Sequence, residues 1–184
     1  MELLTNAEAA LLGLLSEKPR YPYEIEKEVE QRSMREWTDL SMSSIYKLLR
    51  KLEANGYVQA EIEISEENRA RKIYHLTKEG RTGLQNIIGE ILSVPEKTKW
   101  QMDIGISFLT VLDSKKAIEC LLLYRTSLED KIAGYKELEI YLQNEGCPIY
   151  RMDLTRRPVR LWEGELIWIN EYIEELSEGA NNHE

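Results

Sequence analysis

The sequence predicts a mainly α-helical chain with one small β-hairpin, divided into an N-terminal domain and a C-terminal helical domain. Three observations predict this fold class. Short amphipathic segments fill residues 6–54, two alternating segments follow them, and two long segments with apolar residues every three or four positions come last. The expected boundaries are 1–80 for the first domain, 81–100 for a connecting helix and 101–184 for the second domain.

Two helices are expected at the start of the first domain. Thr5 or Asn6 can cap the first helix, because a short polar side chain accepts a hydrogen bond from the first-turn amides. The prolines of "KPRYPYEI" (18–25) end this helix. A second helix is expected from Tyr23 to Arg35.

The segment "SMSSIYKLLRKLEANG" (41–56) predicts a third helix with an unusual charge distribution. Its inner stripe follows helical spacing and consists of Ile45, Leu48, Leu49 and Leu52. Residues 40–52 carry three cations and no carboxylate, although the chain has a net charge of -9. The outward face and its flanks hold Ser43, Ser44, Tyr46, Lys47, Arg50 and Lys51. Such a face, small at its start and basic further on, can enter the major groove of DNA. The alternative is a solvated face that lacks acids by chance.

A β-hairpin is expected directly after this helix. "YVQAEIEI" (57–64) alternates apolar and polar residues, "SEENRA" (65–70) is a polar loop, and "RKIYHLT" (71–77) returns as a second strand. Two strands after a helix-turn-helix form a wing, so the first domain is predicted to be a winged helix-turn-helix. Arg69, Arg71 and Lys72 form a second basic cluster on the same predicted side. The alternative is a hairpin that only stabilises the fold.

Net charge restricts nucleic-acid binding to a local surface. Residues 1–80 contain 12 Lys and Arg against 15 Asp and Glu, and residues 81–184 contain 12 against 18. Neither half is basic as a whole, so an argument for DNA binding from the isoelectric point fails.

The C-terminal half predicts helix-on-helix packing and self-association. The connecting helix contains three glycines, which are expected to soften it. The long helices carry seams with alternating spacings of three and four. The seam residues expected at a dimer interface are Leu121, Tyr124, Leu128, Tyr135, Leu138, Trp162, Leu166, Ile169 and Ile173. The alternative is that these seams pack only within one chain. Residues 145–160 are expected to be a long basic loop, to which no role is assigned.

Enzymatic, metal and membrane functions find no support in the sequence. Cys120 and Cys147 are isolated, and with His75 and His183 they form no zinc spacing, so no metal or cofactor is expected. Cys120, in "AIECLLLY", is expected to be a small core residue. No nucleophile–base pair or phosphate-binding glycine loop is present, which predicts no catalytic residues. Without a signal peptide or an apolar span of sufficient length, the expected location is the cytoplasm.

Four aromatic residues of the C-terminal half are candidates for an effector pocket. These are Trp100, Phe108, Trp162 and Trp168. A small aromatic or apolar effector would fit such a pocket, but aromatic residues at helical spacing belong more often to a core.

The first 80 residues resemble the PadR family of bacterial transcriptional regulators. The matching segments are "YPYEI" (21–25), "SMSSIYKLLRKLEANGYV" (41–58) and "RKIYHLT" followed by "EG" (71–80). The chain departs from the family at Lys47, where the family often has proline after the tyrosine. The C-terminal half matches only loosely, as the helical dimerisation domain of longer family members.

The resemblance implies a homodimeric winged-helix protein that binds a palindromic operator in double-stranded DNA. It also implies that the protein is a repressor released by a small molecule. The alternative from a different functional class is a winged-helix module that binds an acidic protein surface and no DNA.

Overall fold

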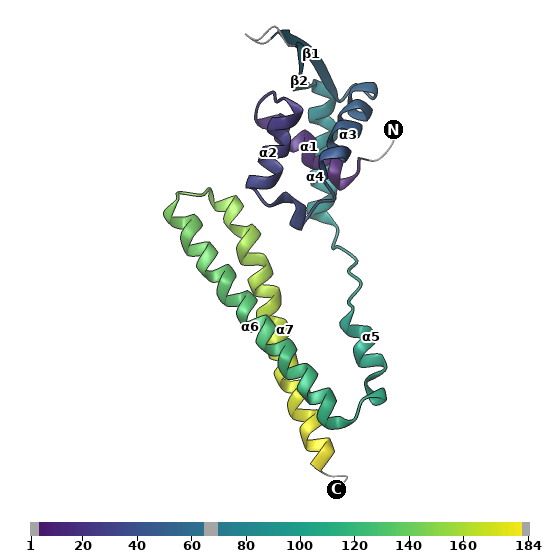
Figure 1. The fold of residues 1–184 in the computed structure, drawn as a ribbon, viewed down its shortest axis with the longest axis vertical. Helices are drawn as coiled ribbons and strands as arrows, with labels where there is room; N and C mark the ends of the chain where they lie inside the picture. Colours follow the sequence, from purple (N-terminus) through teal and green to yellow (C-terminus); the bar gives the residue numbers. More distant parts are fainter. Residues whose placement is uncertain (1–3, 65–69, 182–184) are drawn as a thin grey trace. The chain divides into compact units, whose positions relative to one another are not determined.

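The computed structural model describes residues 4–64 and 70–181 and divides the chain into two compact units, Met1–Thr98 and Lys99–Glu184 (Figure 1). Most of the described chain is helical, and the described strands form one two-stranded antiparallel sheet. The predicted fold class, a winged helix-turn-helix followed by a helical region, is therefore confirmed.

The first unit begins with α1 (Asn6–Glu17) and α2 (Pro22–Gln31). Thr5 caps α1 as predicted, because its hydroxyl accepts a hydrogen bond from the Glu8 amide at 3.2 Å. The second helix is shorter than predicted and ends at Gln31. Ser33 adopts a left-handed backbone with φ 49°, which interrupts the helix before a short 3-10 turn, η1 (Met34–Glu36).

The third helix, α3 (Met42–Ala54), has the predicted boundaries. Ser41 caps it by accepting from the Ser44 amide at 3.2 Å, and Gly56 follows it with φ 75° in the left-handed region. The helices pack around one apolar core. Its buried members are Leu11, Leu12, Leu14, Leu15, Ile25, Val29, Met34, Leu40, Ile45, Leu49, Leu52, Tyr57, Val58 and Tyr74.

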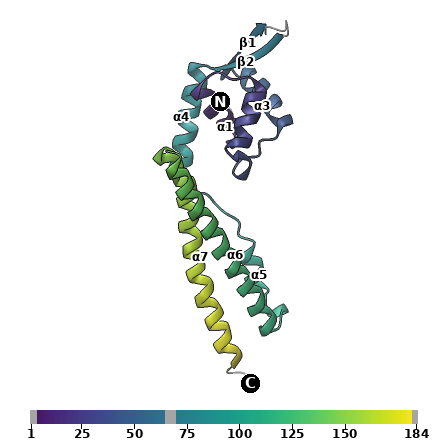
Figure 2. The same ribbon diagram turned by 60° about the vertical axis from the view of Figure 1, so that its left-hand side comes forward.

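The wing consists of β1 (Val58–Ile64) and β2 (Ala70–Leu76), paired antiparallel from Val58 opposite Leu76 to Ile64 opposite Ala70. Figure 2 shows the hairpin projecting beyond the helices of the first unit. Only its base joins the core. Val58 is buried, whereas the side chains of Ile62 and Ile64 are 69% and 72% exposed. The apolar residues that alternate along β1 are therefore buried only at the end of the strand next to α3.

Helix α4 (Lys78–Ser93) belongs to the first unit, where it packs against α1. Thr77 caps it by accepting a hydrogen bond from the Gly80 amide at 3.0 Å. A Cβ atom on Gly80 would lie 2.0 Å from the carbonyl oxygen of Tyr57, and one on Gly83 would lie 3.2 Å from the Tyr57 ring. These two glycines were expected to soften the helix. They instead permit a close approach of α4 to Tyr57.

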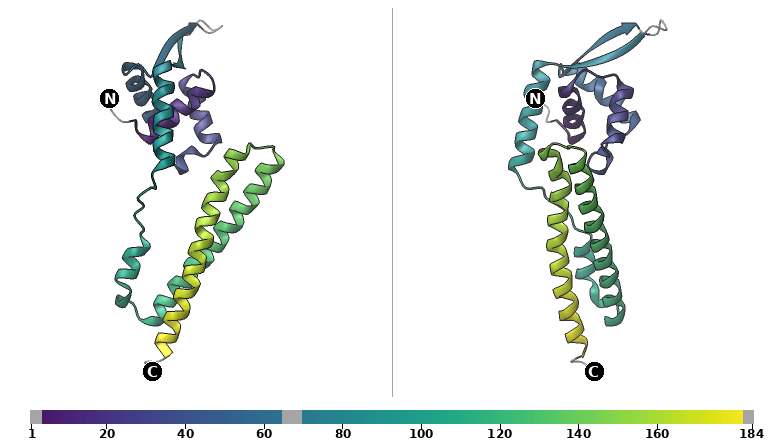
Figure 3. Two further views of the ribbon diagram at one scale, coloured as in Figure 1. Left: turned by 180° about the vertical axis from the view of Figure 1, so that it is seen from behind. Right: turned by 90° about the vertical axis from the view of Figure 1, so that its left-hand side faces the viewer.

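The second unit contains α5 (Met102–Ser107), a 3-10 turn η2 (Leu109–Val111), α6 (Ser114–Asn144) and α7 (Ile149–Asn181). Both views of Figure 3 show α6 and α7 side by side as a helical hairpin. Leu121 and Leu128 of α6 pack with Ile169 and Ile173 of α7 in the buried centre of this hairpin.

Residues 145–160 are mostly helical, so the predicted long loop is wrong. Only residues 145–148 lie between α6 and α7, and Pro158 is accommodated inside α7. Met152, Thr155 and Val159 form a buried stripe at spacings of three and four. Their neighbours are mostly arginine and aspartate, which concealed this pattern in the sequence.

The prediction for Cys120 is also wrong, because its side chain is exposed. The inward direction of α6 at this level belongs to Ala117 and Leu121, and the neighbouring Leu123 is 70% exposed. An apolar run on a long helix covers the whole circumference, so only part of it reaches the core. Within the described residues, no helix is long and apolar enough to cross a membrane.

Candidate nucleic-acid interface

Helix α3 presents the outward face that its periodicity predicts. Ile45, Leu49 and Leu52 are buried, and Leu48 packs partly against the same core. On the other side, Lys47 and Arg50 are exposed, and the Tyr46 side chain is 46% exposed. The hydroxyl and the two cations are thus available to an external partner.

A groove of about 690 Å³ joins the basic end of this face to the wing. Its lining comes from three elements and consists of Tyr21, Pro22, Tyr23, Tyr46, Arg50, Arg71, Lys72 and Tyr74. Arg50 belongs to α3, whereas Arg71 and Lys72 belong to β2. One cation of the first basic cluster and two of the second therefore line one concave surface.

Contacts between distant segments hold the groove in shape. The Tyr21 and Tyr23 rings stack with centroids 5.6 Å apart, and the Tyr21 hydroxyl donates a hydrogen bond to Glu63 on the wing. At the floor, Arg20 and Tyr74 exchange backbone hydrogen bonds of 3.2 and 3.0 Å. The wing is consequently attached to the segment before α2 as well as to its own turn.

Neighbouring charges and burial affect Lys72 and Tyr74 in the groove. Lys72 Nζ lies 3.5 Å from Glu53 Oε2, so one of the three cations is partly neutralised within the chain. Burial raises the pKa of the Tyr74 phenol, with a further contribution from Glu53, although Lys72 and Arg50 act in the opposite direction. The phenol of Tyr74 therefore remains protonated at neutral pH.

Three of the predicted DNA-binding residues on α3 also have partners inside the chain. The Ser44 hydroxyl donates to the Ser41 carbonyl at 2.7 Å and accepts from the Ser41 amide at 2.7 Å, so it belongs to the cap of α3. Lys51 Nζ lies 3.1 Å from Oε1 of the buried Glu8. Ser43 is exposed, and its hydroxyl lies 3.1 Å from that of Ser41.

The predicted site residue Arg69 lies outside the described residues. Sequence reasoning assigned no site role to Tyr21, Tyr23 and Tyr74, which line the groove. The available signal was the pair of tyrosines around Pro22, because a proline that marks the first helical position places both tyrosines at the start of that helix.

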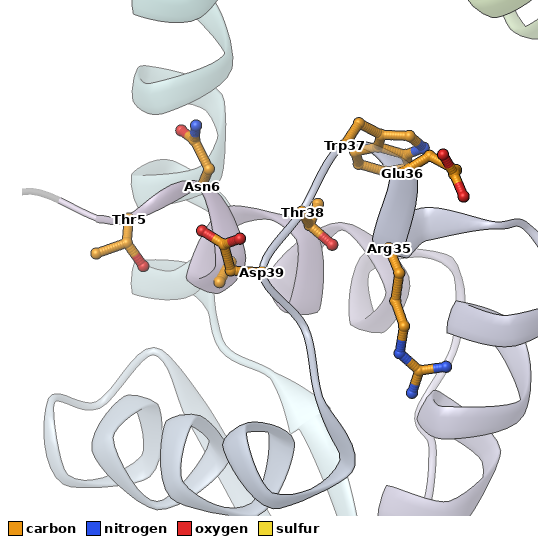
Figure 4. A pocket seen from close by; sticks show the side chains of 8 residues that line it. Thr5, Asn6, Arg35, Glu36, Trp37, Thr38 and Asp39 are labelled. Carbon is orange, nitrogen blue, oxygen red and sulfur yellow. The ribbon is translucent and has the colours of Figure 1, made fainter.

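A second hollow, of about 330 Å³, lies between the start of α1 and the η1 region (Figure 4). Its lining includes the carboxylates of Glu36 and Asp39, while Arg35 is paired with Glu26 and donates to the Leu40 carbonyl at 3.0 Å. These acids make the hollow less suited to a phosphate than the groove beside α3.

Most predicted dimerisation residues pack within one chain. Leu121, Leu128, Ile169 and Ile173 are buried between α6 and α7, and Tyr124, Trp162 and Leu166 pack against them. The Tyr135 and Trp162 rings meet edge to face at 4.8 Å, and Trp168 stacks on Tyr172 at 5.3 Å. Leu138 is 41% exposed. The buried seam residues therefore build the hairpin, and a role of the seams in a dimer stays a prediction.

Some of the exposed apolar residues of the second unit lie on α5 or directly beside it. Trp100, Ile104 and Phe108 are 57%, 65% and 66% exposed, and α5 has no buried residue. Trp100 and Phe108 were considered for an effector pocket, but both are exposed in the single chain.

Comparisons with known proteins agree with this geometry. Residues 11–86 match the profile of the transcriptional regulator PadR-like family. The structure of Bacillus subtilis PadR in complex with operator DNA aligns with a TM-score of 0.74 at 18% identity, over 92% of this chain and 98% of that chain. The same protein in complex with p-coumaric acid gives 0.75 at 18% identity, over 92% and 94%.

A further structural likeness is to the Vibrio cholerae virulence activator AphA, with a TM-score of 0.64 at 20% identity over 94% of this chain and 99% of that chain. At these identities, the TM-scores show a shared fold. A comparison with curated proteins gives no match. The matched residues contain α2, α3 and the wing, which are the elements that build the groove. Residues 11–86 therefore form a domain that matches the transcriptional regulator PadR-like family, in a chain that shares its fold with Bacillus subtilis PadR.

Proposed function

We propose that this protein is a homodimeric, sequence-specific DNA-binding regulator that inserts α3 into the major groove. The groove that joins Arg50 of α3 to Arg71 and Lys72 of the wing carries this proposal. In a chain with a net charge of -9, cations from two elements converge on one surface. Phosphate contacts made by Lys and Arg supply most of the affinity of a protein for DNA.

Each part of the surface has a distinct role in this proposal. Lys47 and Arg50 contact base edges or phosphates, and Ser43 and Tyr46 donate hydrogen bonds from the same exposed face. Arg71 and Lys72 contact phosphate oxygens beside the helix. The acidic remainder of the chain repels DNA from other faces, which favours one docking orientation.

Two copies are needed because one winged helix makes few phosphate contacts. Symmetric half-sites in successive major grooves lie about 34 Å apart, and a homodimer matches a palindromic operator. The exposed apolar residues Trp100, Ile104 and Phe108 support self-association through α5. Exposed apolar side chains that belong to no core of their own chain favour a partner of similar character.

We further propose that the protein is a repressor released by a small aromatic or apolar effector. The fold likeness to Bacillus subtilis PadR, which has been solved with operator DNA and with p-coumaric acid, supports an effector of this class. The same fold also occurs in a virulence activator. A reporter gene placed behind the operator therefore decides between repression and activation. Reduced expression in the presence of the protein is the expected result.

Selection of bound duplexes from a random DNA pool tests the function directly. The expected result is a palindromic consensus bound by a dimer, with affinity that falls steeply as salt concentration rises. A protein-interaction module would enrich no consensus and would bind random duplex DNA without a steep salt slope. That result would reject the proposal.

A further inference from the structure

Glu8 places a buried carboxylate between α1 and the recognition helix α3. Only 2% of its side chain is exposed. One oxygen, Oε2, accepts hydrogen bonds from the Thr5 amide at 2.8 Å and the Thr5 hydroxyl at 3.1 Å. The other oxygen, Oε1, lies 3.1 Å from Lys51 Nζ. The carboxylate thus belongs to the cap of α1 and is also the ionic partner of α3.

The surroundings keep this carboxylate charged. Burial raises the pKa of Glu8, but the hydrogen bonds from Thr5 and the ammonium of Lys51 outweigh burial and lower it below its ordinary value of 4.5. A buried charge without a partner is strongly unfavourable. Lys51 is therefore held at the flank of α3 that faces α1.

From this contact we infer that Lys51 is a positioning residue, which acts through Glu8 to fix the rotation of α3, and is not itself a DNA contact. The inference rests on the proposed DNA-binding function and gives Lys51 a different role from its basic neighbours. Lys47 and Arg50 are exposed on the outward side, whereas the ammonium of Lys51 is directed to a carboxylate that DNA cannot reach.

Helix geometry shows why this contact affects recognition. At about 100° per residue, Lys51 lies about 40° around the helix from Lys47. A rotation of α3 by about 20° would move a group on its outer radius by about 2 Å. Base-reading groups need to be held within about 0.5 Å of their productive position. The close packing of the apolar stripe also opposes this rotation, but apolar contacts carry no direction of their own. The ion pair adds a directional contact.

The decisive variant is Glu8→Gln, because Glu8 is buried and cannot touch DNA. Glutamine retains the capping interaction with Thr5 but removes the charge that holds Lys51. If Lys51 positions α3, Glu8→Gln weakens operator binding, by about fivefold in a dimer that carries the change twice. If Lys51 instead binds phosphate, release from Glu8 leaves the affinity unchanged or raises it.

The salt dependence of binding also distinguishes a positioning role of Lys51 from a phosphate contact. Lys51→Met should weaken binding while leaving the log–log salt slope unchanged. Loss of one phosphate contact in each protomer would reduce that slope by about 1.8. Lys47→Met provides the matched comparison on the exposed side of the same helix. The double variant Glu8→Gln/Lys51→Met should be more stable to heat than Lys51→Met alone, because it leaves no buried charge unpaired.

The experiment uses the full-length protein and a duplex of about 30 base pairs that contains the selected consensus. Circular dichroism and a thermal melt check that each variant is folded. If Glu8→Gln does not fold, the slope of Lys51→Met decides alone. Unchanged or tighter binding by Glu8→Gln, or a reduced slope in Lys51→Met, overturns the inference. Failure of the wild-type protein to bind any duplex instead rejects the proposed function itself.

Discussion

The guanidinium of Arg20 lies 2.7 Å from Glu28 (Nη1 to Oε1) and 2.8 Å from Glu17 (Nη2 to Oε2), although only 3% of its side chain is exposed. Its Nε donates to the Leu14 carbonyl at 3.2 Å, and its backbone pairs with Tyr74 of the wing. Arg20 therefore connects α1, α2 and β2 beneath the groove.

Replacement of Arg20 should destabilise the first unit strongly. Arg20→Met leaves two carboxylates without their buried partner, and we expect the free energy of unfolding to fall by about 2–4 kcal/mol. Arg32 pairs with the same two carboxylates but is 28% exposed, so Arg32→Met should cost about 1 kcal/mol or less. Urea denaturation measures both variants, and equal losses would contradict the distinct role of Arg20.

Stability should decrease in acid because of Glu28. Burial raises its pKa, but hydrogen bonds and charge from Arg20 and Arg32 outweigh burial and lower it below the ordinary value of 4.5. At pH values between the lowered pKa and 4.5, the unfolded chain therefore binds more protons than the folded chain. The stabilisation is complete above about pH 4.5 and is lost as pH falls through the lowered pKa. Denaturation at several pH values should show a smaller acid loss in Glu28→Gln, and an identical pH profile would contradict this.

Two glycines of α4 give a matched pair of variants. A Cβ on Gly80 would lie 2.0 Å from the Tyr57 carbonyl oxygen, whereas a Cβ on Gly89 would meet nothing within 4 Å. Gly80→Ala should destabilise by about 2 kcal/mol or more, because backbone must move to make room. Gly89→Ala should stabilise by about 0.5–1 kcal/mol through helix propensity. Thermal melts would refute the close contact if both changes had the same sign.

DNA binding should depend on the outward cations of α3. Lys47→Ala or Arg50→Ala should cost about 1–3 kcal/mol of operator binding if the residue reads a base, or flatten the salt slope if it meets phosphate. Arg160, 82% exposed on α7, provides the control, and Arg160→Ala should change neither quantity. Full affinity in a folded Lys47→Ala/Arg50→Ala variant would reject α3 as the reading helix.

Self-association should depend on the exposed apolar residues of α5. Ile104→Asp/Phe108→Asp should convert the dimer to a monomer, because a charge placed in an apolar interface is unfavourable. Both side chains are mostly exposed, so helix content should not change. Thr126→Asp/Ser127→Asp adds the same two charges at exposed positions of α6 and should remain dimeric. Sedimentation at micromolar concentration is the measurement, and a monomeric wild-type chain would reject the dimer.

Local patterns predicted the elements better than the surfaces between them. The spacing of Ile45, Leu49 and Leu52 gave both the position and the buried face of α3, because one helix carries that whole pattern. The groove places Arg50 beside residues of β2, which follow it much later in the chain, and no local spacing encodes this proximity. The tyrosines of the groove were missed for the same reason.

The C-terminal seams show a second limit of sequence reasoning. A seam such as Leu121 and Leu128 predicts that a helix packs against another helix, but not which one. The residues that cover this seam, Ile169 and Ile173, belong to the same chain. They lie on α7, which a short turn joins to α6. That turn was concealed because Pro158 and the surrounding arginines made the start of α7 look like a loop.

The outer edge of β1 is covered by no described strand, whereas the outer edge of β2 pairs with Arg20 at Tyr74. Unpaired backbone amides and carbonyls at such edges can recruit strands from other molecules into aggregates. Ile62 and Ile64, exposed on the outer half of β1, would add to this tendency. Glu61 and Glu63 alternate with them along the same strand. The charge repulsion between copies at these positions should keep the wing from extending its sheet with another molecule.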